Sequence, residues 1–200
     1  RDGYFDRGLF REQANRDSVR MIEIKLSQGA KPGHGGLLPA AKITEEIART
    51  RKIPVAQDCL SPAYHTAFST PRELLEFAAS LRADSGGKPV GIKLCVGHPW
   101  EVFALCKAML DSGIRLDFIV VDGAEGGTGA APEEFSDHVG MPLREGLLLV
   151  RNALVGTGLR PDIRLAASGK VYSAYTMAAN LALGADWCNA ARAFMLSLGC

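Results

Sequence analysis

Short apolar segments alternate with longer segments of helical periodicity along the second half of the chain. The apolar segments, which we expect to be β-strands, cover residues 90–96, 118–122, 163–167 and 186–189. The segments after them, which we expect to be helices, cover residues 99–111, 142–154, 173–183 and 192–198. Repeated strand–helix units of this kind indicate a parallel sheet, either open and doubly wound or closed as a barrel.

The first half of the chain is predicted to contribute a fifth strand, because apolar and charged side chains alternate over residues 21–26. Thr44 is a candidate cap for a helix over residues 42–52, and Thr70 for a helix that opens on a proline and runs to about residue 82. The segments without a clear period are expected to be a loop or helix at residues 1–20 and irregular at residues 53–66.

Glycine and polar residues follow the carboxyl ends of the predicted strands. They are Gln28-Gly29, Gly97-His98, residues 123–129, Ser168-Gly169 and residues 190–192. The loops at these strand ends build the active site of a barrel, so we predict an α/β fold of the TIM (β/α)8 type rather than an open sheet. Because a whole barrel takes about 250 residues, we interpret the 200 residues as the C-terminal part of a single barrel domain, roughly its last five βα units.

Net charge and cysteine content indicate which binding partners and which cellular compartment to expect. The formal net charge of +1 gives no electrostatic reason to expect nucleic acid or an anionic membrane as a partner. Five cysteines, an odd number without a C-x-x-C pair, favour a reducing compartment such as the cytoplasm over a disulfide framework. The first residues show neither an initiator methionine nor a signal peptide, so we expect both ends to be cuts in a longer chain.

Residues 21–39 join the first predicted strand to a loop with four glycines. Such a loop is costly to order unless its backbone turns tightly or lies close to a ligand. Lys25, Gln28 and Lys31 could bind an anion or a carbonyl group there. A flexible surface loop is the alternative interpretation.

The segment EIKLSQGAKPGHGG resembles the active-site loop of the FMN-containing synthase domain of glutamate synthases. The resemblance continues in GIKLCVGHPWE, VVDGAEGGTGAAPEEFSDHVGMPLREGL, LAASGKV and GADWCNAAR, and covers nearly all of the chain. It looks closest to the stand-alone FMN-binding members of the family, which lack a glutaminase domain.

The resemblance implies an FMN oxidoreductase that reduces 2-iminoglutarate, formed from 2-oxoglutarate and ammonia, to glutamate. Electrons would come from a donor protein or reductase subunit through a [3Fe–4S] cluster, and a homo-oligomer is one option. Two alternatives stay open: action on another amine, imine or keto acid, and a role as an FMN-bearing electron-transfer subunit.

Residues after the last two predicted strands are candidates for binding the FMN phosphate, as the corresponding loops of TIM barrels often bind phosphate. They are Ser168, Gly169, Ala190, Ala191 and Arg192. The alternative interpretation is an ordinary strand-to-helix turn, which also favours serine and glycine. The family resemblance described above favours the phosphate-binding interpretation.

Lys93 lies among apolar residues in a predicted strand, where an unpaired ammonium would be costly. An ion pair with a carboxylate such as Asp122 is one interpretation. The family instead has a lysine in this strand against the flavin ring. It also has a G-G-T-G segment over the active site, which corresponds here to Gly126, Gly127, Thr128 and Gly129; a plain glycine-rich loop is the alternative.

The resemblance assigns Lys31 and Arg51 to the carboxylates of 2-oxoglutarate, and Lys25 and Gln28 to orienting or polarising the substrate. Without the resemblance, Lys31 and Arg51 would be interpreted as ordinary solvated side chains. Cys200 corresponds to the first of three cluster cysteines.

The chain departs from the glutamate synthases in the glycine loop, where their Glu and Gln are replaced by His34 and Leu37. The four histidines show no metal-ligand spacing and are interpreted as structural residues or as residues behind the site.

Overall fold

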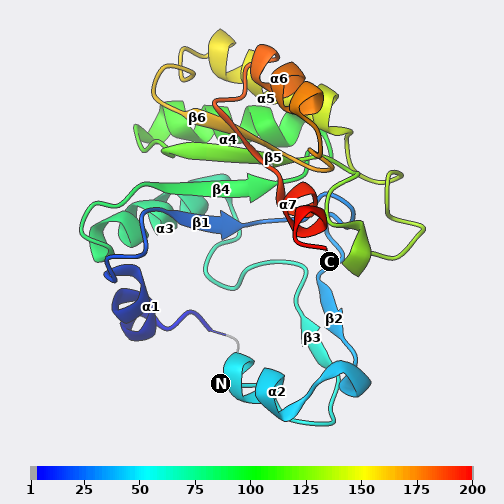
Figure 1. The fold of residues 1–200 in the computed structure, drawn as a ribbon. Coiled ribbons are helices and arrows are strands. Elements are labelled where there is room, and N and C mark those ends of the chain that lie inside the picture. The colour runs from blue at the N-terminus through cyan, green and yellow to red at the C-terminus, as the bar shows by residue number, and fades with distance from the viewer. Residues whose placement is uncertain (1–3, 200) are drawn as a thin grey trace. The chain divides into compact units, whose positions relative to one another are not determined.

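The computed structural model describes residues 4–199, and the chain divides into two compact units (Figure 1). The first unit consists of the residues up to Pro32 together with those from Thr66 onward. It holds a five-stranded sheet in the order β1-β4-β5-β6-β7, and all neighbouring strands are parallel. The second unit, Gly33–His65, holds a two-stranded sheet.

All five predicted strands of the parallel sheet are confirmed, with ends that lie within two residues of the prediction. They are Ile22–Lys25 (β1), Val90–Leu94 (β4), Phe118–Asp122 (β5), Arg164–Ser168 (β6) and Trp187–Asn189 (β7). The helices of this unit are Arg7–Ala14 (α1), Pro71–Asp84 (α3), Pro99–Ser112 (α4), Leu143–Gly156 (α5), Ala174–Ala182 (α6) and Ala191–Ser197 (α7), with a 3-10 turn at Thr128–Ala130.

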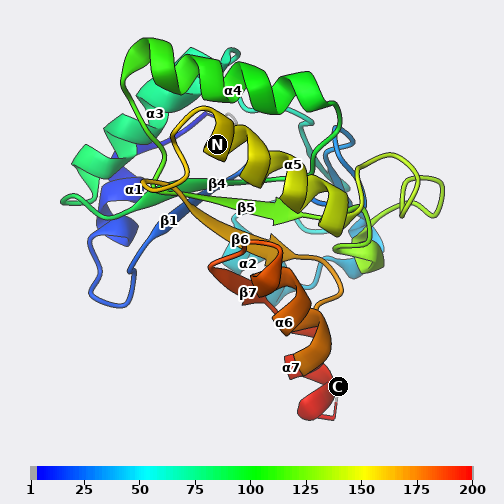
Figure 2. The same ribbon diagram turned by 90° about the horizontal axis from the view of Figure 1, so that it is seen from above.

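Helices α3, α4 and α5 cover one face of the sheet (Figure 2). Alternate strand residues such as Ile92, Ile119 and Leu165 point to this side, where they are almost fully buried against helix residues such as Leu75 and Leu147. Apolar residues recur every second position in the strands and with the helical period in the segments between them. Both patterns follow because strands and helices bury their apolar side chains in the same core.

The opposite face of the sheet carries the other half of the strand residues, and in a (β/α)8 barrel this face lines the interior. Phe118, Val120 and Ala166 form a small apolar cluster there, with Trp187 packed against it. By the same alternation, Glu23, Lys25, Lys93 and Asp122 lie on this face of β1, β4 and β5. This face therefore carries charged side chains beside an apolar cluster.

Several residues predicted to start or end a helix do so in the structure. Thr70 forms a capping box with Glu73, and Thr44 accepts a hydrogen bond from the amide of Ile47. Helix α4 stops at Gly113, whose φ of 71° is left-handed and therefore suits glycine.

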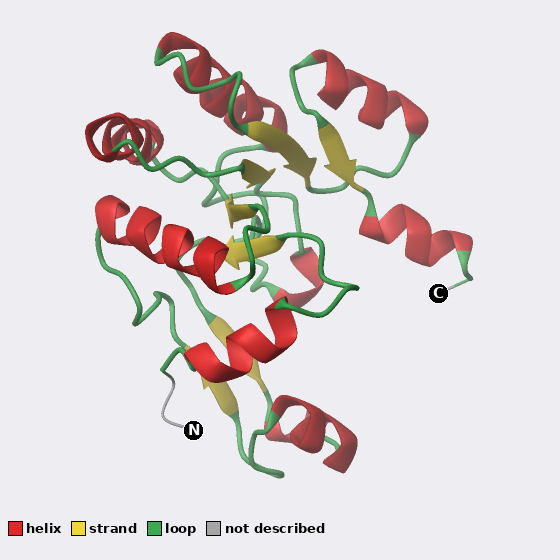
Figure 3. Cartoon of the chain, turned by 90° about the vertical axis from the view of Figure 1, so that its left-hand side faces the viewer, coloured by secondary structure: helices red, strands yellow, loops and turns green. Residues whose placement is uncertain are grey.

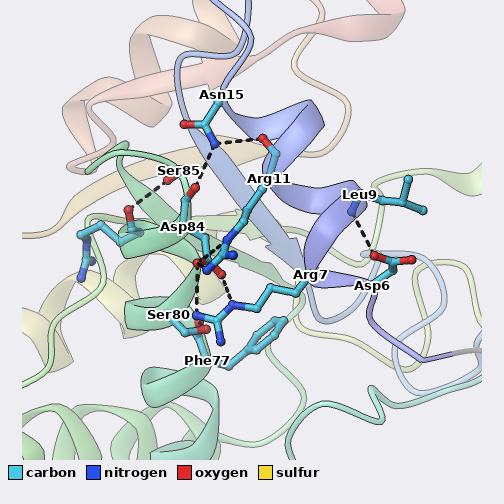
Figure 4. A network of polar contacts seen from close by, with 10 residues as sticks. Asp6, Arg7, Leu9, Arg11, Asn15, Phe77, Ser80, Asp84 and Ser85 are labelled. Atoms are coloured by element: carbon cyan, nitrogen blue, oxygen red, sulfur yellow. Dashed lines mark hydrogen bonds and ion pairs between the residues drawn. The ribbon is translucent and has the colours of Figure 1, made fainter.

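Asp84 anchors helix α1 to helix α3 (Figure 4). Its carboxylate is 4% exposed and accepts hydrogen bonds from Arg7 and Arg11, while its carbonyl oxygen accepts one from Asn15. The hydrogen bond from Arg7 is the main cause that holds the pKa of Asp84 below its ordinary value. Because the folded-state pKa is lowered, this anchor stabilises at higher pH and is lost as the pH falls through that pKa. The N-terminal segment is thus a helix, one of the two predicted options.

The second unit contains a strand pair that the sequence did not predict. Its elements are Gly36–Leu38 (β2), a 3-10 turn at Ala40–Lys42, Glu45–Arg51 (α2) and Cys59–Ser61 (β3). Strands β2 and β3 are antiparallel and appear as a pair of short arrows in Figure 3. The prediction that residues 53–66 are irregular is wrong for β3, because a strand of three residues is too short to show a period.

Between residues 4 and 199, no helix has the length and apolar character needed to cross a membrane.

Candidate active site

The loops that follow β1 and β5 are joined at the carboxyl end of the sheet. Three hydrogen bonds connect them: Gly29 N to Asp122 Oδ2 at 2.8 Å, Ala30 N to Gly126 O at 2.7 Å, and Gln28 Nε2 to Gly127 O at 2.6 Å. The two glycine-rich segments predicted to form one site therefore do meet.

Two glycines make this close approach possible. A Cβ built on Gly29 would lie 1.7 Å from the carbonyl oxygen of Gly123, so no other residue fits there without movement of the backbone. Gly127 has a φ of 76°, and a Cβ there would meet the Gln28 side chain at 2.3 Å. Gly29 thus lets the two loop backbones pack closely, and Gly127 leaves room for the Gln28 side chain.

Lys93 and Asp122 form an ion pair at 3.5 Å between Nζ and Oδ2, with 20% and 4% of their side chains exposed. This confirms the ion-pair interpretation of Lys93. Since an ammonium has three donors, the pair leaves Lys93 able to donate to a ligand as well. The same Asp122 oxygen accepts the amide of Gly29, so one carboxylate organises both the lysine and the loop.

Lys25 donates to Gln28 Oε1 at 3.2 Å, which joins the two residues expected to orient a substrate. Partial burial is the main cause that lowers the pKa of Lys25, followed by the positive charges of Lys93 and Lys31. Partial burial likewise raises the pKa of Glu23, and the nearby lysines oppose that change. Glu23 was not a predicted site residue, although its position two residues before Lys25 in a strand places both on one face.

The loops after β5, β6 and β7 also lie together. Arg192 Nη2 donates to Thr128 Oγ1 at 3.3 Å. A Cβ on Gly169, whose φ is 122°, would lie 3.2 Å from the amide of Gly123. Ser168 pairs with Asn189 in the sheet, so the loops after β6 and β7 begin side by side.

The donors at these strand ends fit a phosphate group. Ala190 is the N-cap of α7 and offers no side-chain hydrogen bond to the first turn, whereas Ser173 caps α6 with its hydroxyl. The first amides of α7, those of Ala191 and Arg192, have no acceptor within the helix. The hydroxyl of Ser168 and the Arg192 guanidinium are further donors of the kinds that bind phosphate oxygens. That these groups bind one phosphate together stays a prediction.

The structure does not test whether Lys31 and Arg51 act together. Lys31 follows Gln28 in the loop after β1, and its charge contributes to lowering the pKa of Lys25. Arg51 is exposed at the end of α2 and belongs to the second unit, so the joint action of the two residues stays a prediction. Cys200 lies outside the described residues.

No cluster of His, Cys, Asp and Glu side chains that could hold a metal is present in residues 4–199. The four cysteines in this range are free. Burial raises the pKa of the Cys95 thiol to about 11, with a smaller contribution from Asp122, so this thiol is not a nucleophile near neutral pH.

The sequence of this chain matches a known protein family. A family profile described as the conserved region in glutamate synthase matches residues 12–200. The chain belongs to the glutamate synthase family.

Similar members of the glutamate synthase family come from bacteria and archaea. The chain is 44% identical over its whole length to the glutamate synthase large subunit-like protein YerD of Bacillus subtilis (strain 168), of which it covers 38%. It is 42% identical over 90% of its length to the archaeal glutamate synthase (NADPH) of Methanocaldococcus jannaschii, of which it covers 34%. The chain thus spans little more than a third of these relatives.

A solved structure supports the fold of this glutamate synthase family member. The structure of QR15, an aldolase, matches with a TM-score of 0.52 at 14% identity, covering 96% of this chain and 64% of that one. With the five parallel βα units, this confirms the α/β fold of TIM-barrel type. That the units are the last five of one barrel domain stays a prediction.

Proposed function

We propose that the protein containing these residues is an FMN-dependent oxidoreductase of glutamate synthase type that reduces 2-iminoglutarate, formed from 2-oxoglutarate and ammonia, to glutamate. The observation that supports it best is that the loops after β1, β5 and β7 are hydrogen-bonded to one another at the carboxyl end of the sheet. Gln28 contacts the G-G-T-G loop at Gly127, and Arg192 contacts it at Thr128. The names of the curated relatives support the same reaction class.

The cofactor would be held from two sides. Ser168, Gly169, Ala190, Ala191 and Arg192 would bind the FMN phosphate, while Lys93 and the backbone of Gly126, Gly127 and Thr128 would lie at the ring. Bound FMN supplies the hydride-transfer chemistry that no side chain can. Lys93 would stabilise the negative charge that accumulates when the ring is reduced.

The substrate would be held by charged and polar groups near the loop after β1. Lys31 and Arg51 would bind carboxylates, for which the planar guanidinium is well suited. Lys25 and Gln28, which are already hydrogen-bonded to each other, would orient the carbonyl or imine group.

Electrons would enter through a [3Fe–4S] cluster that takes Cys200 as one ligand, from a donor protein or reductase subunit. Several thiolates close together are needed for such a cluster, so its other ligands would come from beyond this chain. The proposed compartment is the cytoplasm, where thiols stay reduced.

Purification of the full-length protein tests the proposal. We expect it to be yellow with non-covalent FMN and to contain iron and sulfide after anaerobic preparation. Lys93→Met should lower the flavin midpoint potential by about 30 mV or more, which for two electrons is about 1.4 kcal/mol. Lys107→Met, on the exposed side of α4, should leave the potential unchanged. A colourless protein that takes up no FMN would contradict the proposal.

A further inference from the structure

Asp122 is a buried charged residue to which the proposed reaction gives no role. It is the last residue of β5, and 4% of its side chain is exposed. Its Oδ2 lies 3.5 Å from Lys93 Nζ on β4 and accepts the amide of Gly29 at 2.8 Å. One oxygen atom therefore joins the lysine expected at the flavin ring to the loop expected at the substrate.

The backbone around Asp122 leaves its carboxylate little freedom to move. A Cβ built on Gly126 would lie 2.5 Å from Asp122 Oδ1, so the second oxygen is packed against the chain at that glycine. The amide of Gly126 donates to the Gly123 carbonyl at 2.7 Å, and the Gly126 carbonyl accepts the amide of Ala30 at 2.7 Å. Because both of its oxygens are held, the carboxylate can fix the position of the groups bound to it.

The two groups that Asp122 binds both need such fixing. Lys93 carries its charge at the end of a flexible four-carbon stem, and that freedom must be lost when the ammonium takes one position. The loop after β1 has four glycines within residues 29–36, which makes its order costly. The amide of Gly29 ties the start of this loop to a charged acceptor, and such hydrogen bonds are the stronger ones.

We propose that Asp122 is a positioning residue that holds both Lys93 and the loop of residues 28–31 in the places where FMN and the substrate would meet them. The inference rests on the proposed function in one respect, namely that Lys93 lies at the flavin ring and the loop at the substrate. Asp122 acts through these groups and contacts neither FMN nor the substrate. Loss of its charge should therefore disturb both groups at once.

Hydrogen exchange of the full-length protein tests the link to the loop, and it needs no bound FMN. Asp122→Asn keeps the size of the side chain but replaces a charged acceptor by a weaker neutral one. We expect the amides of residues 28–31 to exchange about 10-fold faster, the low end of the effect of losing a bond to a charged group. Asp111→Asn, the same change on the exposed side of α4, should leave these amides unchanged. Equal exchange in the two variants would overturn the proposal.

A double-mutant cycle on the bound flavin tests the link to Lys93. In the unmodified protein, Lys93→Met should favour oxidised over reduced flavin about 10-fold. We expect a change of about 3-fold or less in the Asp122→Asn background, because a lysine that is no longer held stabilises the reduced ring less. In the Asp111→Asn background the change should stay about 10-fold. If the effect of Lys93→Met is as large or larger without the Asp122 carboxylate, Asp122 does not position the lysine.

Lys93→Met supplies a second measurement of the loop in case Asp122→Asn does not fold. A buried carboxylate that loses its cation is unfavourable, so Asp122 should turn toward water and release the amide of Gly29. Residues 28–31 should then exchange faster in Lys93→Met than in the exposed control Lys107→Met, and equal exchange would contradict the proposal. If none of these proteins binds FMN, the proposed function fails, while hydrogen exchange still decides the role of Asp122.

Discussion

Gly29 is the residue at which the two site loops come closest. Any Cβ there would collide with the Gly123 carbonyl, which belongs to the backbone and cannot rotate away. We expect Gly29→Ala to destabilise the protein by about 3 kcal/mol or more, the upper range for an overpacked position, and to weaken FMN binding. Gly129→Ala in the loop after β5, where a Cβ would have no neighbour within 4 Å, is the matched control. Urea unfolding and flavin titration of both variants measure the difference, and equal stability of the two would refute the packing argument.

Residue identity was enough to predict part of the site. Gln28, Lys93 and Arg192 could be found because their types and positions after strands, or within them, point to ligand binding. Asp122 was foreseen only as a partner for Lys93, and its second bond, to Gly29, depends on how the two loops cross. Glu23 was missed because its neighbours on β4 and β5 are set by the register of the sheet, which no local pattern encodes.

A repeated arrangement fixes the amino-terminal ends of the strands. Asp117, just before β5, accepts the amide of Val90 at 2.7 Å and pairs with Arg82. Asp186, just before β7, accepts the amide of Leu165 at 2.7 Å and pairs with Arg160. In each case the aspartate accepts a backbone amide near the start of the neighbouring strand and forms an ion pair with an arginine. The same arrangement therefore occurs at two places in the sheet.

This arrangement predicts unequal effects of aspartate removal. Asp117→Ala leaves the amide of the buried residue Val90 without its acceptor, so we expect a loss of about 1–3 kcal/mol. Asp111→Ala removes only an exposed pair with Lys107 on α4 and should cost about 0.5 kcal/mol or less. Thermal and urea unfolding would show this, and equal losses would mean that the strand-end hydrogen bond contributes nothing.

The elements that the sequence predicted well share a long periodic signal or a clear cap. Helix α3 was recognised from Thr70 and Glu73, which do form a capping box. The short strand β3 was not recognised, because its pairing with β2 joins segments separated by helix α2 and depends on tertiary contact. The strands and helices of the repeated βα units could therefore be predicted from local chemistry, including the three-residue strand β7, while the paired strands β2 and β3 could not.

At the scale of the whole molecule, the residues that the family resemblance assigns to the substrate come from both compact units of the chain. Lys31 lies in the first unit, while Arg51 and Leu37 lie in the second. The glutamate synthases have glutamine where this chain has Leu37, and leucine can neither donate nor accept a hydrogen bond. A dicarboxylate would therefore bind with one hydrogen bond fewer, although both cationic residues remain.

Substitution of that leucine tests whether position 37 contacts the substrate. Leu37→Gln should tighten 2-oxoglutarate binding about 10-fold or more, because a hydrogen bond to a charged group is worth about 1.5–3 kcal/mol. Leu60→Gln is the matched control: Leu60 pairs with Leu37 across β2 and β3, and both are more than half exposed. Both full-length variants would be titrated with 2-oxoglutarate while the flavin spectrum is followed. If Leu37→Gln binds no more tightly than the unmodified protein, position 37 does not contact the dicarboxylate, and selectivity must come from Lys31 and the interior face of the first unit.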